Sequence, residues 1–282
     1  MLKSILNQFR KFREHIFGCF SYRSDAAMEL IDALASNTTA NSVVGLSENH
    51  AFRRGYGSIH DVISNFNQDP NQSECIERCL LRYCSPITEA QPFRLMVLDC
   101  TSAPRPYSKT LHDKGVIYSP NPVLGNKPIT IGHQYSVMGF LPEQASTHKN
   151  PPWILPISVR RVATDTNGIN IAIEQMTMAA SHFKEDLSIF VGDVSYSKPV
   201  FIKSIQENDN ALLIARLTSN RIINRKPSTR KGRKPQSGVK SLWEKLPFRC
   251  HFRRRTNRAK LTIASSRLRL NGKDVVQNYP GM

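Results

Sequence analysis

The chain has 282 residues, of which 40% are hydrophobic and 22% are charged, so it is long enough for one large domain or two small ones with a buried core. No stretch approaches the roughly 18 consecutive apolar residues of a membrane span, and the N-terminal stretch is interrupted by too many charges for a secretion signal. The composition therefore excludes a membrane-spanning or wholly disordered protein, and we expect a cytoplasmic protein without a membrane partner.

The formal net charge of +17 is concentrated at the C-terminal end. Residues 221–282 contain 18 lysines and arginines and two acids, whereas residues 1–220 contain 21 basic and 20 acidic residues. A basic block usually indicates nucleic-acid binding. This block, however, is rich in arginine and has no clear periodicity. A change of reading frame would explain the arginines, because repeated GAA codons for glutamate become AGA codons for arginine when they are read one base out of frame. We therefore expect an out-of-frame extension from about residue 236.

Residues 1–88 are predicted to form a helical N-terminal region. Apolar residues recur at helical spacing along residues 2–12 and again along residues 27–34. Ser58 and Asp61 have the spacing of a capping box, which would begin a helix before the sequence VISNF. Such a region could bind DNA in the manner of a helix-turn-helix, or it could be a purely structural helical domain.

Three of the six cysteines lie close together in the sequence ECIERCLLRYC, with three and four residues between successive cysteines. This is the spacing of one helix face, whereas a zinc knuckle would need C-x-x-C pairs. We expect reduced thiols on the apolar stripe of a helix, with a structural zinc site as the alternative. The six are Cys19, Cys75, Cys79, Cys84, Cys100 and Cys250.

From Phe93 onward the sequence pattern changes to strands and then to alternating helices and strands. Strands are predicted at 93–100, 131–141, 153–162, before Asp193 and at 211–217, and helices at 170–183 and 199–207. The connection after the first strand is rich in proline, and Pro156 is tolerable only at a sheet edge or a bulge. This order predicts an α/β fold, a mixed sheet with flanking helices.

Two of the predicted strands end on a carboxylate. Asp99 follows the apolar run of FRLMVLD, and Asp193 follows that of LSIFVG. An unpaired buried charge is unfavourable, and ligands of open α/β sheets sit at the carboxyl ends of the strands, so we expect both carboxylates in one cleft. Each aspartate could instead stabilise a local turn. Asp99 could cap the turn into residues 101–104, and Asp193 could anchor the turn before Tyr196.

The element order and the motifs VLDCTSAPRP, VGDVSYSKPVF and ARLTSNRIINRKP resemble the ribonuclease H-like core of bacterial DDE transposases. The similarity covers about residues 18–235 and is greatest to the insertion-sequence group with a helical region before the catalytic core. It implies metal-dependent cleavage and strand transfer of double-stranded DNA at the ends of a mobile element. It also implies that Asp99 and Asp193 ligate Mg²⁺ in a two-metal site.

A third carboxylate of the family, a glutamate on a helix after the last core strand, has no counterpart here. After Glu207 the chain contains one glutamate, Glu244, which lies too close to the last strand and lacks the family's Tyr…Arg…Glu…Lys context. We therefore expect an incomplete catalytic core over residues 89–235, followed by a basic tail over residues 236–282 that is disordered or out of frame. The resemblance then implies a truncated and inactive copy with an incomplete Mg²⁺ site.

Candidate contacts to the DNA backbone are Lys198, Arg216 and Arg221, of which Lys198 lies at a helix entrance where a phosphate could bind. Arg160 and Arg161 are adjacent, so they should point to opposite faces of their strand. The resemblance also implies a bacterial, nucleoid-associated protein that could form a homodimer. Two alternatives stay open: a noncatalytic DNA-binding protein or inhibitor of a full-length transposase, and a nucleic-acid-coating protein that binds through its tail.

Overall fold

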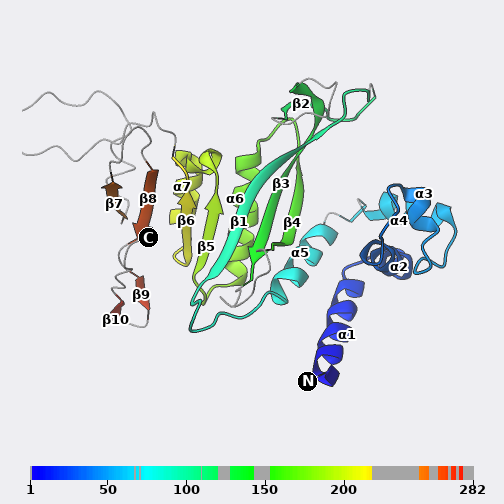
Figure 1. Ribbon diagram of the computed structural model, residues 1–282, viewed down its shortest axis with the longest axis horizontal. Helices are drawn as coiled ribbons and strands as arrows, with labels where there is room; N and C mark the ends of the chain where they lie inside the picture. Colours follow the sequence, from blue (N-terminus) through cyan, green and yellow to red (C-terminus); the bar gives the residue numbers. More distant parts are fainter. Residues whose placement is uncertain are drawn as a thin grey trace, which may run out of the picture. The chain divides into compact units, whose positions relative to one another are not determined.

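The chain divides into two compact units, residues 1–85 and residues 86–282. In the described residues the first unit consists of helices, and the second is built on a mixed sheet (Figure 1). No described helix is both long enough and apolar enough to cross a membrane. The computed structural model describes residues 2–66, 68–69, 71–108, 110–119, 128–142 and 153–217, and the backbone of four short strands at 248–253, 260–265, 268–270 and 273–275.

The helical unit is held together by small apolar clusters and by ion pairs between helices. In one cluster, Ile16 packs with Met28 and Cys79. The guanidinium of Arg13 donates two hydrogen bonds to the Asp32 carboxylate, at 2.5 and 2.9 Å. The helices are α1 (Leu2–Gly18), α2 (Ser24–Ala35), α3 (Val43–Ser47), α4 (Tyr56–Phe66) and α5 (Gln72–Arg82).

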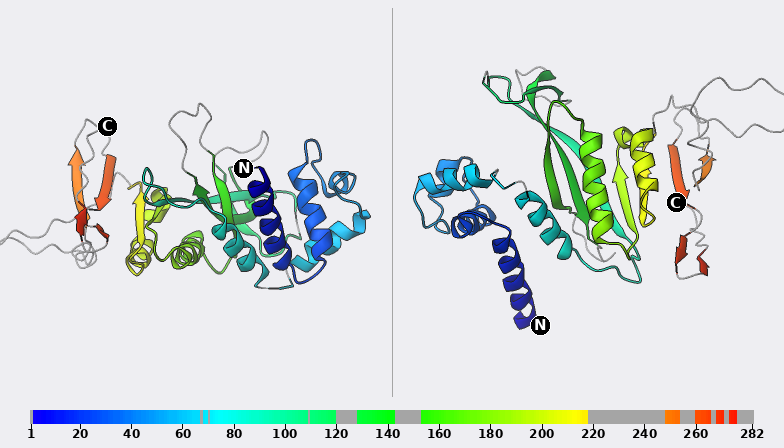
Figure 2. Two further views of the ribbon diagram at one scale, coloured as in Figure 1. Left: turned by 90° about the horizontal axis from the view of Figure 1, so that it is seen from below. Right: turned by 180° about the vertical axis from the view of Figure 1, so that it is seen from behind.

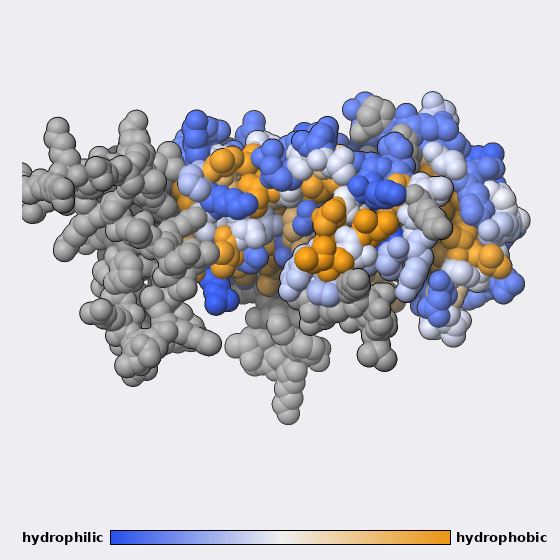
Figure 3. Space-filling model, turned by 90° about the horizontal axis from the view of Figure 1, so that it is seen from above, coloured by the Kyte–Doolittle hydropathy of each residue, from blue (hydrophilic) through white to orange (hydrophobic). Residues whose placement is uncertain are grey.

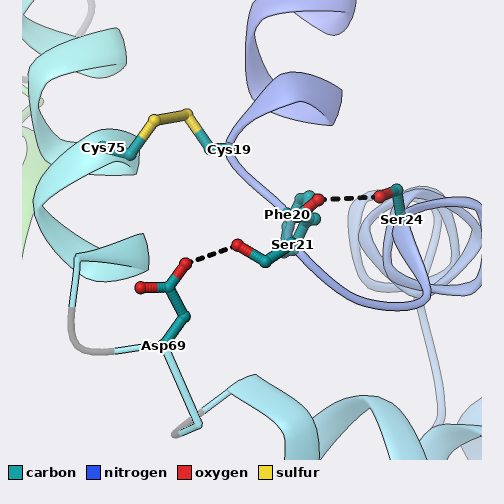
Figure 4. The surroundings of a disulfide bond; sticks show 6 residues. All are labelled: Cys19, Phe20, Ser21, Ser24, Asp69 and Cys75. Atoms are coloured by element: carbon teal, nitrogen blue, oxygen red, sulfur yellow. Dashed lines mark hydrogen bonds between the residues drawn. A yellow bond between two sulfur atoms is a disulfide. The ribbon is translucent and has the colours of Figure 1, made fainter.

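A disulfide joins Cys19, just after α1, to Cys75 on α5, with their Cα atoms 5.5 Å apart (Figure 4). Beside it the Ser21 hydroxyl donates to the Asp69 carboxylate. The expectation that these two thiols are reduced is therefore wrong. Spacing within α5 could not reveal this bond, because the partner lies 56 residues away. Cys79 and Cys100 are free thiols.

The predicted capping box is also wrong. Helix α4 begins at Tyr56, so Ser58 is already inside its first turn, and its amide donates to the carbonyl of Gly55 at 2.9 Å. The Asp61 carboxylate instead forms an ion pair with Arg23, at 2.9 Å. The helix starts earlier than the Ser-x-x-Asp pattern indicates, because the tyrosine and glycine before Ser58 also adopt helical geometry.

The second unit contains a six-stranded mixed sheet with the order β2-β3-β1-β5-β6, and β4 also pairs with β3. β1 runs antiparallel to β3 and parallel to β5, which is parallel to β6. The helices α6 and α7 connect β4 to β5 and β5 to β6. This is the ribonuclease H-like arrangement predicted from the sequence. The bounds are β1 (Arg94–Pro104), β2 (Gly115–Tyr118), β3 (Ile129–Leu141), β4 (Leu155–Val162), α6 (Gly168–His182), β5 (Ser188–Gly192), α7 (Pro199–Gln206) and β6 (Ala211–Ala215).

Two details of the sheet depart from the sequence prediction or refine it. Strand β2 was not predicted, because it is short and only Ile117 of its four residues is buried. Pro156 lies where the register between β3 and β4 shifts, next to Met138 and Gly139, which confirms that it occupies an irregular position. A short 3-10 helix, η1 (Val194–Ser197), separates β5 from α7.

Helices α6 and α7 both lie on one face of the sheet. They stand behind the strands in Figure 1 and in front of them in the right panel of Figure 2. Buried Met96, Leu98 and Phe190 point toward this helix-covered face. The other face carries the alternate residues, among them half-buried Val97 and Val159, which is 58% exposed.

The surface seen from above in Figure 3, the end at which Figure 1 shows β2, carries separate apolar patches between hydrophilic residues. Val116 and Tyr118 of β2 are 79% and 62% exposed. Within residues 236–282, the structure describes two antiparallel strand pairs, β7 (Phe248–Arg253) with β8 (Lys260–Ser265) and β9 (Leu268–Leu270) with β10 (Lys273–Val275).

Candidate functional site

Asp99 lies on β1 at the point where its parallel partner ends. The strand continues to Pro104 and stays paired with β3, so the predicted end at residue 100 and the turn over residues 101–104 are wrong. Its ladder with β5, however, stops at Leu98, opposite Gly192. Asp99 is exposed, and its Oδ1 accepts a hydrogen bond from the amide of Cys100 at 2.8 Å.

Asp193 directly follows β5 and caps η1. Its Oδ1 accepts a hydrogen bond from the amide of Ser195 at 2.7 Å, and its Oδ2 lies 3.4 Å from the Ser195 hydroxyl. The residue is exposed. The expectation that Asp193 anchors the turn before Tyr196 is therefore confirmed, and the same residue still presents a carboxylate at the end of a strand.

The register of the parallel ladder brings the two aspartates to neighbouring positions. Each residue of β1 pairs with the residue 94 positions later on β5, from Arg94 with Ser188 to Leu98 with Gly192. If the register continued by one residue, Asp99 would pair with Asp193. Extended by this one step, the register would bring the two carboxylates to neighbouring positions at the carboxyl edge of β5, and the charges of both act on Cys100 and Tyr196.

Behind the carboxylates, on the helix-covered face, four residues pack closely. Ser136 pairs with Cys100 across β1 and β3. Gly168, the first residue of α6, lies so close that a Cβ there would stand 2.2 Å from the Cys100 sulfur. Tyr196 is 1% exposed. Sequence reasoning missed Cys100 and Gly168, since a small residue at a helix start gives no sign of what packs against it.

The negative charge of the two aspartates reaches this buried group. Burial is the main cause that raises the pKa of the Cys100 thiol, and the charges of Asp99 and Asp193 raise it further. Burial likewise raises the pKa of the Tyr196 hydroxyl, and Cys100 and both aspartates add to the effect. Burial and the neighbouring carboxylates therefore favour the protonated form of both groups.

Of the candidate DNA contacts, Arg216 directly follows β6, the parallel partner of β5. Gly192 pairs with Ala215, the last residue of β6, so the next step places Arg216 beside Asp193. Lys198 is exposed between η1 and α7. Arg221 lies outside the described residues, as does Glu244.

Arg160 and Arg161 point to opposite faces of β4, as predicted. Arg160 donates to Glu174 of α6 at 3.3 Å, whereas Arg161 forms an ion pair with Asp113. They therefore do not form one basic patch.

The donor chemistry of the aspartate pair fits a divalent cation. Each carboxylate is exposed, and Asp99 Oδ2 accepts no hydrogen bond among the described residues. Hard oxygen ligands suit Mg²⁺, which keeps several of its own waters and so needs few protein ligands. In the described part of the chain, no group of three or more histidine, cysteine, aspartate or glutamate residues could hold a metal. The pair therefore offers two protein ligands.

Comparison with protein families identifies residues 15–270 as matching the DDE superfamily endonucleases. This match spans most of the 282 residues. The chain belongs to this family. Membership in the DDE superfamily endonucleases implies a transposase-like nuclease that acts on DNA with divalent metal ions. No curated protein matches the chain. The family match continues past residue 236, where the sequence led us to expect a change of reading frame.

Proposed function

We propose that Asp99 and Asp193 are the metal-ligating carboxylates of a DDE transposase that cleaves DNA at the ends of a mobile element and joins the strands. The observation that carries this proposal is the ladder register, which leads both aspartates to neighbouring positions at the end of β5. When bound, Mg²⁺ would activate the attacking oxygen and stabilise the leaving oxygen of the phosphodiester. The protein's own part is to hold two carboxylates on rigid strands, exposed to the DNA.

We also propose that this copy has little or no catalytic activity. A site with two aspartates lacks the third carboxylate that the family resemblance implies, and Glu244 has neither the position nor the sequence context for that role. A nicking assay with supercoiled DNA and Mg²⁺ tests this, with Asp193→Asn as the matched control. Robust nicking by the wild type that is lost in the variant would contradict the inactivity and support the metal site.

Lys198 and Arg216 support DNA binding near the aspartates, because both side chains are exposed. One further step of the β5–β6 register would also pair Arg216 with Asp193. Phosphate contacts release counterions, so affinity for DNA should fall as salt rises. Replacing Arg216 by glutamine should lower this salt dependence, as measured by fluorescence anisotropy of labelled DNA. An unchanged slope would remove Arg216 from the interface.

The second candidate function is a noncatalytic DNA-binding protein that inhibits a full-length relative. It is favoured by the finding that the described residues contain no group of three or more histidine, cysteine, aspartate or glutamate residues that could hold a metal. This function predicts that selective binding to the element's inverted repeats survives Asp99→Asn combined with Asp193→Asn. Loss of selective binding in the double variant would argue against it.

The nucleotide sequence of the gene distinguishes a truncated copy from an intact one. If a second frame opens near codon 236 and encodes a glutamate in a Tyr…Arg…Glu…Lys context, the gene is a frameshifted transposase gene. If stop codons close that frame, the basic tail is genuine. The family match extends to residue 270, which supports a genuine tail.

A further inference from the structure

The mixed sheet has one face that no described helix of its own unit covers. Helices α6 and α7, the two described α-helices of residues 86–282, both lie on the opposite face (Figure 2). The uncovered side, which we call the open face, carries the alternate residues of the strands. The apolar side chains at its centre, given by the pairing of β1, β3, β4, β5 and β6, are Leu95, Val97, Val137, Val159, Ile189, Val191, Leu212 and Ile214.

The open face is apolar without interruption over this central part. Val159 and Ile214 are 58% and 45% exposed, and the other side chains of the set are half-buried. The nearest charges on this face are at its rim, where Asp99, Arg161 and Arg216 each lie two residues beyond an apolar member of the set. Soluble monomers rarely expose contiguous apolar patches of more than a few hundred Å². The open face therefore needs a partner that covers it.

The size of the open face fits a small specific interface. Five neighbouring strands about 4.8 Å apart, with five residues in β5 and in β6, give a flat area of about 400 Å². The relief of the side chains brings the accessible area closer to the roughly 600 Å² that each partner buries in a small stable complex. A second sheet covers such a face most completely, because sheets pack face to face about 10 Å apart.

Composition and charge favour a second copy of this chain as that partner. Residues 218–247, which follow β6, contain nine lysines and arginines and one acid, so their composition does not suit an apolar face. A second copy brings an identical apolar surface, and a two-fold axis makes such a surface complementary to itself. If the strands of the two sheets ran in the same direction, the two Asp99 carboxylates would meet and repel each other. Opposite directions place them at opposite ends of the interface.

We propose that the open face is the interface of a homodimer, in which two copies pack their sheets face to face with opposite strand directions. The dimer removes the central apolar side chains from water and leaves the charged residues at the rim. This inference goes beyond the proposed function, because it requires neither a metal ion nor DNA. It also explains why β1, β5 and β6 are apolar on both faces, which is typical of strands that are covered on both sides.

Sedimentation velocity of the full chain at about 1–100 μM tests this proposal, in about 0.5 M sodium chloride, which screens contacts through the basic tail. The wild type should shift from the mass of one chain to that of two as its concentration rises. Val159→Lys and Ile214→Lys should each raise the dissociation constant of the dimer about 10-fold or more, because a charge would be buried in an apolar interface. The matched control is Val200→Lys on α7, at a side chain that is 61% exposed and lies away from the open face.

Urea unfolding separates a loss of association from a loss of folding. Both lysines replace exposed side chains, so the unfolding midpoints of the variants at low protein concentration should match that of the wild type. The inference is overturned if the wild type remains a single chain at about 100 μM. It is equally overturned if Val159→Lys and Ile214→Lys dimerise as tightly as the wild type, or if Val200→Lys weakens the dimer as much as they do.

Discussion

Replacing Gln175 by leucine should strongly destabilise the sheet unit, because this side chain ties α6 to two strands from a fully buried position. The Ser136 hydroxyl donates to its Oε1 at 2.7 Å. Its Nε2 donates to the Ser136 carbonyl at 3.2 Å and to the Ser158 hydroxyl at 2.7 Å. All three residues are at most 1% exposed, so water cannot replace the lost partner.

The magnitude follows from these three bonds. A buried hydrogen bond contributes about 1 kcal/mol net, and a polar group left unpaired adds a further penalty, so the loss should be about 2–4 kcal/mol. Leucine is slightly larger than glutamine, so the substitution leaves little or no cavity. Urea unfolding followed by far-UV circular dichroism measures the change, with hydrogen exchange of the α6 amides assigning it to this unit.

A triple variant supplies the control. Adding Ser136→Ala and Ser158→Ala to Gln175→Leu removes both hydroxyls together with their partner and leaves the Ser136 carbonyl, so part of the stability should return. The reasoning would be refuted if the single variant lay within about 0.5 kcal/mol of the wild type, the range of ordinary surface substitutions. It would also be refuted if the triple variant were as unstable as the single one.

Three further changes have definite expected outcomes. Hydrogen bonds from Thr164 and the charge of Arg161 hold the pKa of Asp113 below its usual 3.8. The Asp113→Asn variant should therefore be less stable than the wild type at neutral pH. In urea unfolding at lower pH, this difference in stability should vanish as the pH falls below that value. Gly168→Ala forces a Cβ against the Cys100 sulfur and should destabilise by about 1–3 kcal/mol, a loss that an added Cys100→Ala should partly reverse. Cys19→Ser removes the disulfide of the helical unit and should cost about 2–4 kcal/mol; dithiothreitol should lower the wild type's melting temperature similarly and leave the variant's unchanged.

The strands and their aspartates were predictable because buried strands have a local signature. The apolar runs before Asp99 and Asp193 are continuous, which is typical of central strands, although in the structure buried and half-buried residues alternate along β1. The strand at 188–192 and the helices at 168–182 and 199–206 agree with the prediction, and the first strand begins as predicted but continues to residue 104. The change from successive strands to alternating helices then restricts the sheet to few arrangements.

The parts that sequence reasoning missed depend on residues far apart in the chain. The disulfide of Cys19 has its partner in another helix, and Gly168 matters only because Cys100 lies beneath it. The capping pattern at Ser58 failed for the opposite reason, since the local rule was satisfied but the helix had already begun. Local patterns therefore identify elements well and contacts between elements poorly.

The separation of 94 residues between Asp99 and Asp193 acquires a physical meaning from the ladder. It equals the offset between β1 and β5 at every paired position, so strand pairing directs the two aspartates toward neighbouring positions, whatever the path of the chain between them. A slip of one residue in that ladder would turn one carboxylate to the helix-covered face. Met96, Leu98 and Phe190, buried against the helices, oppose such a slip. The hydrophobic core therefore sets the relative position of the two groups on which the proposed metal chemistry depends.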